Sequence, residues 1–218
     1  MKQKIQWKNH FIELLVVVIG ITIAFMLENW RQENANKELE QKYLSSLKSD
    51  LTSDKKLLGS TISSVEKQSS ILGEFVAEIG IGNVSKQKAE EMIPQVLISH
   101  GFAPKQATYQ SITNSGNLNI INDYKLIESL ASYYNSYDEL SIKEKVLYDY
   151  QLKFVLPFVY ENVDFLSGEI VNKSAINGFE FKNIVTGYYT LLRQNLEVYK
   201  NYEQANKELL EIINKYLN

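Results

Sequence analysis

The sequence contains no cysteine, two histidines, ten glycines and three prolines in 218 residues. Without cysteine, the chain has no disulfide, no thiolate metal site and no cysteine nucleophile. The two histidines, His10 and His100, lie far apart and form no HExxH-like pair, so we expect no metal site and no other cofactor. The scarcity of glycine and proline favours long helices over a turn-rich β fold.

A strong charge of one sign is also missing. The chain has 23 basic and 26 acidic residues, a formal net charge of −3. A nucleic-acid-binding protein carries a basic face, so we expect no nucleic-acid partner. The sequence contains no phosphate-binding loop and no other motif that indicates catalysis. We therefore expect that the protein is not an enzyme.

The most informative feature that is present is the apolar run HFIELLVVVIGITIAFMLENW, residues 10–30. Between Phe11 and Leu27 its only polar residues are Glu13 and Thr22. A helix of this length spans about 25 Å, slightly less than the roughly 30 Å hydrocarbon core of a bilayer. The run therefore predicts a transmembrane helix.

The residues that flank this run support a span that stays in the membrane. Trp7 and Trp30 would lie about 35 Å apart on one helix, as aromatic anchors at the two headgroup levels. A cleaved signal peptide would need a small-x-small site after the run, and the sequence has none there. A helix of a soluble protein is the other alternative. The run is apolar around the whole helix, which is too uniform for a helix at a protein surface. We interpret residues 11–30 as an uncleaved signal anchor in the lipid bilayer.

The distribution of basic residues predicts the orientation. Three lysines precede the span (Lys2, Lys4 and Lys8), and the acid-rich flank after it also carries basic residues. The positive-inside rule gives a modest bias towards a cytoplasmic N-terminus. The expected organisation is a cytoplasmic leader (1–10), the span (11–30) and a periplasmic domain (31–218) in a bacterial inner membrane. We therefore expect no cytoplasmic output domain before the span.

Glu13 is a carboxylate near the cytoplasmic edge of this span, and two interpretations of it remain open. Its side chain extends to the interface or pairs with His10, one turn earlier. Alternatively, it contacts a partner helix or carries a proton, as intramembrane acids often do. Gly20 and Ala24 form a small-xxx-small pair that lets two helices approach closely. Glu13, Gly20 and Ala24 are therefore our candidates for contacts inside the membrane.

Heptad patterns after the span predict an all-α domain. Apolar residues recur every seven positions in one long segment: Leu44, Leu51, Leu58, Val65, Leu72 and Ile79. Asp54 and Gln68 are polar companions in this pattern, which favours a helix inside a bundle over a free coiled coil. A second heptad segment begins at Phe179. We expect the transmembrane helix to continue into an antiparallel bundle of about four helices, with Gly59 as a point of interruption.

Between these two segments, the sequence predicts shorter helices and a third long one. A helix over residues 86–99 should bend at Pro94. A brief helix should stop at Gly116, and Asp123 should cap the next helix. That third long helix, residues 124–163, should be kinked or ended by Pro157. Its tyrosines, above all Tyr133, Tyr134 and Tyr137, either line a ligand groove between helices or are large core residues.

Two runs of the sequence carry a resemblance to a known family. The first is IELLVVVIGITIAFMLENWRQENANKELEQKYLSSLKSDL and the second is TYQSITNSGNLNIINDYKLIESLASYYNSYDEL. They resemble a family of uncharacterised bacterial single-span envelope proteins, a domain-of-unknown-function family. The matching residues are Glu13, Gly20, Asn29, Trp30, Leu44, Leu47, Leu51, Ser115, Gly116, Asn117, Leu118, Tyr133 and Tyr134. The chain departs from the family pattern at Ile12 and Glu28, where glycine and asparagine are expected.

The resemblance implies an inner-membrane protein with a helical extracytoplasmic domain, and it implies no known activity. Two functions remain in view. The first is a membrane-anchored scaffold or accessory subunit that binds other envelope proteins or further copies of itself. The second is a sensor-like module that binds a ligand between its helices and signals through a partner's membrane span. A ligand-induced thermal shift would distinguish the second from the first.

Overall fold

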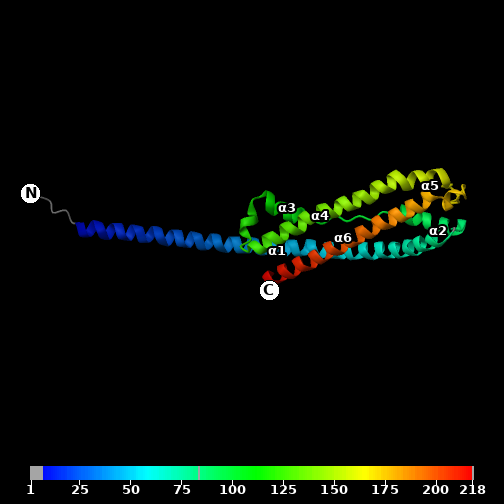
Figure 1. Ribbon diagram of the computed structural model, residues 1–218. Coiled ribbons are helices and arrows are strands. Elements are labelled where there is room, and N and C mark those ends of the chain that lie inside the picture. The colour runs from blue at the N-terminus through cyan, green and yellow to red at the C-terminus, as the bar shows by residue number, and fades with distance from the viewer. Residues whose placement is uncertain (1–6, 83, 218) are drawn as a thin grey trace, which may run out of the picture.

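A computed structural model describes residues 7–82 and 84–217, with side chains from residue 11 onward (Figure 1). Its dominant element is α1 (Trp7–Ile81), one helix of 75 residues. Gly59 does not interrupt it, because a single glycine inside a packed helix lowers stability by only about 1 kcal/mol. The apolar run and the first arm of the bundle therefore share one continuous helix.

The other described elements are also helical. They are α2 (Lys86–Leu97), α3 (Ala107–Asn114), η1 (Asn117–Ile120), α4 (Tyr124–Tyr150), η2 (Gln151–Val155), α5 (Leu156–Asn162), η3 (Ala175–Asn177) and α6 (Phe179–Leu217). Among the described residues, extended pairing is limited to an isolated bridge between Val163 and Ile170. The prediction of an all-α fold, with a long N-terminal helix leading into a helical domain, is confirmed.

The bundle is arranged around α6. This helix packs against both α1 and α4, and α2 and α3 cover α1 as well. Figure 1 shows α4 and α6 alongside the second half of α1, whereas the first half of α1 projects alone. The fourth position of the bundle is filled by α2, the extended segment 98–106 and α3 in succession. We call residues 98–106 the connector.

The heptad positions form the core of the bundle. In α1 they are all buried: Leu44, Leu51, Leu58, Val65, Leu72 and Ile79. The apolar heptad residues of α6 fall into two registers, and those that are buried are Val185, Leu192, Tyr199 and Ile213 in one and Tyr188, Tyr202 and Leu209 in the other. Tyr216, at the end of α6, is partly exposed, and its hydroxyl donates to Asp123. The core therefore runs along the full length of α6.

The turns before α4 agree with the sequence. Gly116 adopts φ of 72°, a left-handed conformation that glycine tolerates best. Asp123 caps α4, because its Oδ1 accepts hydrogen bonds from the backbone N–H groups of Lys125 (2.7 Å) and Leu126 (3.1 Å). The two predicted boundary signals are confirmed.

The third long helix is distorted before Pro157. α4 passes into the π-helical turn η2, and Pro157 lies in the first turn of α5. Proline has no N–H to donate to the preceding turn, and its ring crowds the carbonyl four residues earlier. A wider π turn relieves this crowding and lets the chain continue as helix to Asn162. Pro157 therefore distorts the helix and does not end it.

Candidate functional site

The contact candidates in the apolar run share one face of α1. Steps of seven and four residues return to nearly the same side of a helix, so Glu13, Gly20 and Ala24 lie in one line. None of the described side chains of this run, residues 11–30, is buried inside the protein. A Cβ atom added at Gly20 would meet nothing within 4 Å. The three residues of this face are exposed.

The two aromatic anchors lie near the two ends of the apolar run. Trp7 is the first residue of α1, and its side chain lies outside the described residues. The side chain of Trp30 is exposed. Next to it, Arg31 forms a bidentate pair with Glu28, with the shorter contact at 2.7 Å. The candidate span therefore ends in an aromatic residue and a local ion pair, which is typical of a membrane–water interface.

The predicted tyrosine cluster lies on α4 and faces α6 and α3. Tyr133 and Tyr134 are buried, and Tyr137 is half-buried. The ring of Tyr133 stacks on Tyr202 at 4.6 Å between centroids, and the ring of Tyr134 stacks on Tyr109 at 4.2 Å. Burial raises the pKa of both Tyr133 and Tyr134. Tyr133 also lines a cavity of about 340 Å³ between α4 and α6.

The connector is held by polar side chains of α1. Its backbone is not helical, so its buried N–H and C=O groups need partners from elsewhere. Asp54 accepts the backbone N–H of Lys105 at 3.0 Å. Gln68 donates its amide to the backbone carbonyl of Ile98 in the connector (3.3 Å) and to that of Gln95 in the last turn of α2 (2.5 Å). The two polar heptad positions of α1 therefore bind the segment that replaces a fourth helix.

The other two long helices bind the same segment. From α4, Glu144 accepts the backbone N–H of Phe102 at 2.8 Å. At the start of η2, Oε1 of Gln151 accepts the hydroxyl of Ser99 at 2.7 Å, and its amide donates to the carbonyl of Ile98 at 3.4 Å. From α6, the hydroxyl of Tyr188 donates to the carbonyl of Ile98 at 2.7 Å. All three long helices are thus joined through one extended stretch of backbone.

His100 lies in the connector and contacts α1 directly. Its Nε2 is 3.0 Å from Oε1 of Gln68. Because the amide nitrogen of Gln68 is the donor to the carbonyls, its oxygen must be the acceptor, so His100 donates from Nε2. Burial lowers the pKa of His100. This burial favours the neutral imidazole, in which Nδ1 is an acceptor.

A cavity opens beside this histidine. It has a volume of about 340 Å³ and is lined by Ser99, His100, Ser141, Glu144, Lys145, Leu147, Tyr148 and Gln151. Burial raises the pKa of Glu144, whose Oε1 also accepts a hydrogen bond from the hydroxyl of Tyr199 at 2.5 Å. The cavity therefore combines hydroxyl, amine, imidazole and carboxyl groups in a space of the size of a small polar ligand.

Tyr134 was predicted as a site residue, and its hydroxyl donates to the carbonyl of Lys105 in the connector at 3.4 Å. The other residues described above as binding the connector were not predicted. The signal for two of them was present, since Asp54 and Gln68 are polar residues at core heptad positions. A buried polar side chain needs a hydrogen-bond partner, and the loop GFAPKQ offered unpaired backbone groups. For Glu144 and Gln151 the sequence contains no comparable pattern. The described residues contain no group of three or more His, Cys, Asp or Glu side chains that could hold a metal ion.

Comparison with known proteins identifies the family of the chain. Residues 13–194 match a family of unknown function, DUF6090. This match covers most of the chain, so the protein belongs to this family, and the resemblance to an uncharacterised family is confirmed. The search of curated proteins finds no match, and neither does the search of solved structures.

Proposed function

We propose that the protein is a membrane-anchored helical scaffold or accessory subunit that mediates protein–protein interaction in the bacterial envelope. The observation that carries the proposal is the continuity of α1 from Trp7 to Ile81. Its first part is an apolar helix that the rest of the protein leaves exposed, and its second part is the central arm of the bundle. A helix without a hinge holds the domain at a fixed distance from the membrane.

The proposed topology places the N-terminus in the cytoplasm and residues 31–218 in the periplasm, in a bacterial inner membrane. The asymmetry of the lysines before the span supports this orientation. We expect that protease added to spheroplasts digests the domain after Trp30, whereas the same protease leaves a cytoplasmic control protein intact. Protection of the domain in intact spheroplasts would mean that the orientation is reversed.

The proposed partners contact the span through the face of Glu13, Gly20 and Ala24. We expect Glu13→Gln and Gly20→Leu each to lower the amount of protein partner that co-purifies from native membranes in mild detergent. Polar contacts between membrane helices contribute about 0.6–2 kcal/mol, so the loss should be several-fold and not complete. The amount of inserted protein should stay constant.

The matched control for this experiment is Val18→Leu. Val18 lies on the opposite side of α1 from Gly20, because two residues correspond to about 200° of rotation. This variant adds bulk to the span without touching the proposed contact face, so partner recovery should equal that of the wild type. If Glu13→Gln and Gly20→Leu also leave recovery unchanged, the span is a plain anchor and the contacts lie in the bundle.

A second candidate function is a sensor-like binding module, and the cavity at His100 is the observation that favours it. A ligand that bonded to Nδ1 of His100 would act on a ring whose Nε2 is bound to Gln68 of α1. Since α1 is continuous with the candidate span, a movement of this ring and of Gln68 would reach the membrane through one helix. A panel of small polar metabolites that raises the melting temperature of the wild type, but not of His100→Phe, would support this function over the first.

A further inference from the structure

The end of α1 and the segment between α5 and α6 lie at the end of the bundle that is farthest from the N-terminus of α1 (Figure 1). This part of the chain carries five large apolar side chains that are exposed. They are Ile81 (90% exposed), Phe165 (63%), Leu166 (100%), Val171 (67%) and Phe179 (80%). Such side chains are expected singly on a protein surface, whereas a group at one end marks a site of interaction. We call Ile81–Gly82 and the segment 163–179 the distal cap.

The loop that carries Phe165 and Leu166 is ordered by polar contacts. Asp164 accepts the backbone N–H of Leu166 (2.9 Å) and the hydroxyl of Ser167 (3.0 Å). Its backbone N–H donates to the carbonyl of Glu169 at 2.9 Å, which closes the loop. The two apolar side chains contribute nothing to this closure, so the loop holds them in solvent.

The rest of the distal cap is fixed to the bundle in the same way. Glu90 of α2 accepts the backbone N–H of Ile170 at 2.8 Å, and Lys86 contacts Glu169 at 3.1 Å. Across the turn after α1, the backbone N–H of Val84 donates to Oδ1 of Asn177 at 2.8 Å. The exposed apolar residues therefore stand on one connected unit, and presenting them requires no further ordering of the chain.

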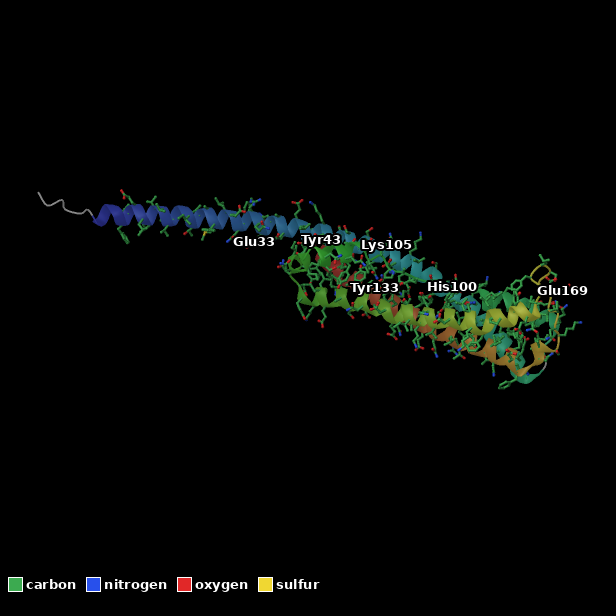
Figure 2. All side chains as sticks on the ribbon, turned by 90° about the horizontal axis from the view of Figure 1, so that it is seen from above. Glu33, Tyr43, His100, Lys105, Tyr133 and Glu169 are labelled. Atoms are coloured by element: carbon green, nitrogen blue, oxygen red, sulfur yellow. The ribbon has the colours of Figure 1, made fainter. Side chains whose placement is uncertain are left out.

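The position of the distal cap excludes contact with the bilayer that would hold its own span. Between Trp30 and Ile81 there are 51 helical steps, which at 1.5 Å each separate the two residues by about 77 Å. α1 has no break over this distance. Figure 2 places Glu33 on the projecting part of α1 and Glu169 at the opposite end of the protein. A partner that covers the distal cap must therefore approach from the side that faces away from the bilayer holding the span.

The shape and charge of the distal cap indicate what that partner is. Leu166 is completely exposed and Ile81, the last residue of α1, nearly so, which means that they project into solvent and do not line a groove. The charges around them compensate each other, because Lys86 pairs with Glu90 and Glu169, and Lys88 pairs with Glu78. A protein would need a separate pocket for each projecting side chain. The fluid boundary of a bilayer accepts them without such a match.

We propose that the distal cap inserts into a second lipid bilayer, which faces the one that holds the span. The protein then bridges two membranes at a separation that the length of α1 sets. This inference rests on the proposed membrane anchorage and names a further partner for the scaffold. Binding should not require anionic lipid, since segment 163–179 carries one lysine, Lys173, against two acids, Asp164 and Glu169.

The test uses the full chain incorporated into lipid nanodiscs through its span. The discs are mixed with protein-free phosphatidylcholine vesicles, and the vesicles are floated on a density gradient. We expect discs with the protein to float with the vesicles and empty discs to stay behind. The double variant Phe165→Ser/Leu166→Ser should lower co-flotation at least about tenfold, a change that corresponds to about 1.4 kcal/mol. Ile81→Ser, at the end of α1, should lower it as well.

The matched control is Ile142→Ser, which removes an exposed apolar side chain from the side of α4. It should float like the wild type, and all variants should keep the wild-type melting temperature because the changed side chains are exposed. Wild-type discs that do not float, or a double variant that floats equally, would overturn the second-bilayer proposal alone. Flotation only with vesicles that contain membrane proteins would overturn it in favour of a protein partner. A chain that does not enter discs would overturn the anchorage and the bridge together.

Discussion

Leu51→Ala and Leu192→Ala are each expected to lower the free energy of unfolding by about 2–5 kcal/mol. Leu51 of α1 is 0% exposed and Leu192 of α6 is 1% exposed. The truncated side chain leaves a cavity that the surrounding helices fill only partly, so the loss includes both the transfer of the methyl groups and the cavity itself. Denaturant unfolding in mild detergent, followed by helical circular dichroism, measures this change where the transition is two-state.

Leu57→Ala is the matched control for these variants. Leu57 lies in the same helix, and its side chain is 47% exposed. The same substitution there should change the free energy of unfolding by less than about 0.5 kcal/mol. If Leu51→Ala and Leu192→Ala also fell below this value, the two heptads would face water and the packing of α1 on α6 would be different from that described.

The heptads were the part of the fold that the sequence predicted best. Each of these positions faces the same side of a long helix, so burial is encoded locally in the spacing of the apolar residues. All six predicted positions of α1, from Leu44 to Ile79, are buried. Gly116 and Asp123 were predictable for the same reason, because a left-handed turn and a helix cap each depend on a single residue type.

The connector could not be predicted from such local patterns. Its conformation depends on Asp54, Gln68, Glu144 and Gln151, which come from helices far apart in the sequence. A loop such as GFAPKQ gives no sign of which side chains will satisfy its backbone. The bundle of about four helices was the right architecture, yet its fourth position is built from two short helices and this extended stretch.

The candidate sites also differ in how far the sequence predicts them. The contact face of Glu13, Gly20 and Ala24 follows from helical periodicity alone, so the sequence was sufficient to propose it. The distal cap could not be predicted from the sequence, because an apolar residue such as Leu166 or Phe179 is normally assigned to the core. Only the folded arrangement shows that these side chains remain in solvent.

Asp54→Leu is expected to lower the free energy of unfolding by about 1–3 kcal/mol, since it leaves a buried N–H group without an acceptor. Asp54 is 2% exposed, and its carboxylate accepts the backbone N–H of Lys105 and, at 3.3 Å, the hydroxyl of Tyr133. Leucine fills a similar volume but accepts neither bond. Asp54→Asn keeps an acceptor for Lys105, so its effect at neutral pH should be clearly smaller.

A comparison of the wild type with Asp54→Asn also tests the ionisation of Asp54. Burial raises the pKa of this carboxyl, against the opposing hydrogen bonds from Lys105 and Tyr133, and Asp50 adds to the rise. The folded protein therefore keeps the proton at pH values where the unfolded chain has already lost it, starting at about pH 4. In that window the folded state binds more protons than the unfolded state, so the contribution of Asp54 to stability decreases as the pH rises.

Glu144 must be separated from Asp54 in this experiment, because burial raises its pKa too and gives a pH dependence of the same sign. We expect wild-type stability, measured by denaturant unfolding from pH 4 upward, to fall relative to that of Asp54→Asn until the carboxyl is ionised in the folded state. Above that point the difference should be constant, and Glu144→Gln should remove a separate part of the slope. Parallel stability curves for the wild type and Asp54→Asn over the whole range would show that the pKa of Asp54 is not raised. In that case the bond to Lys105 would hold the connector as an ordinary ionised contact.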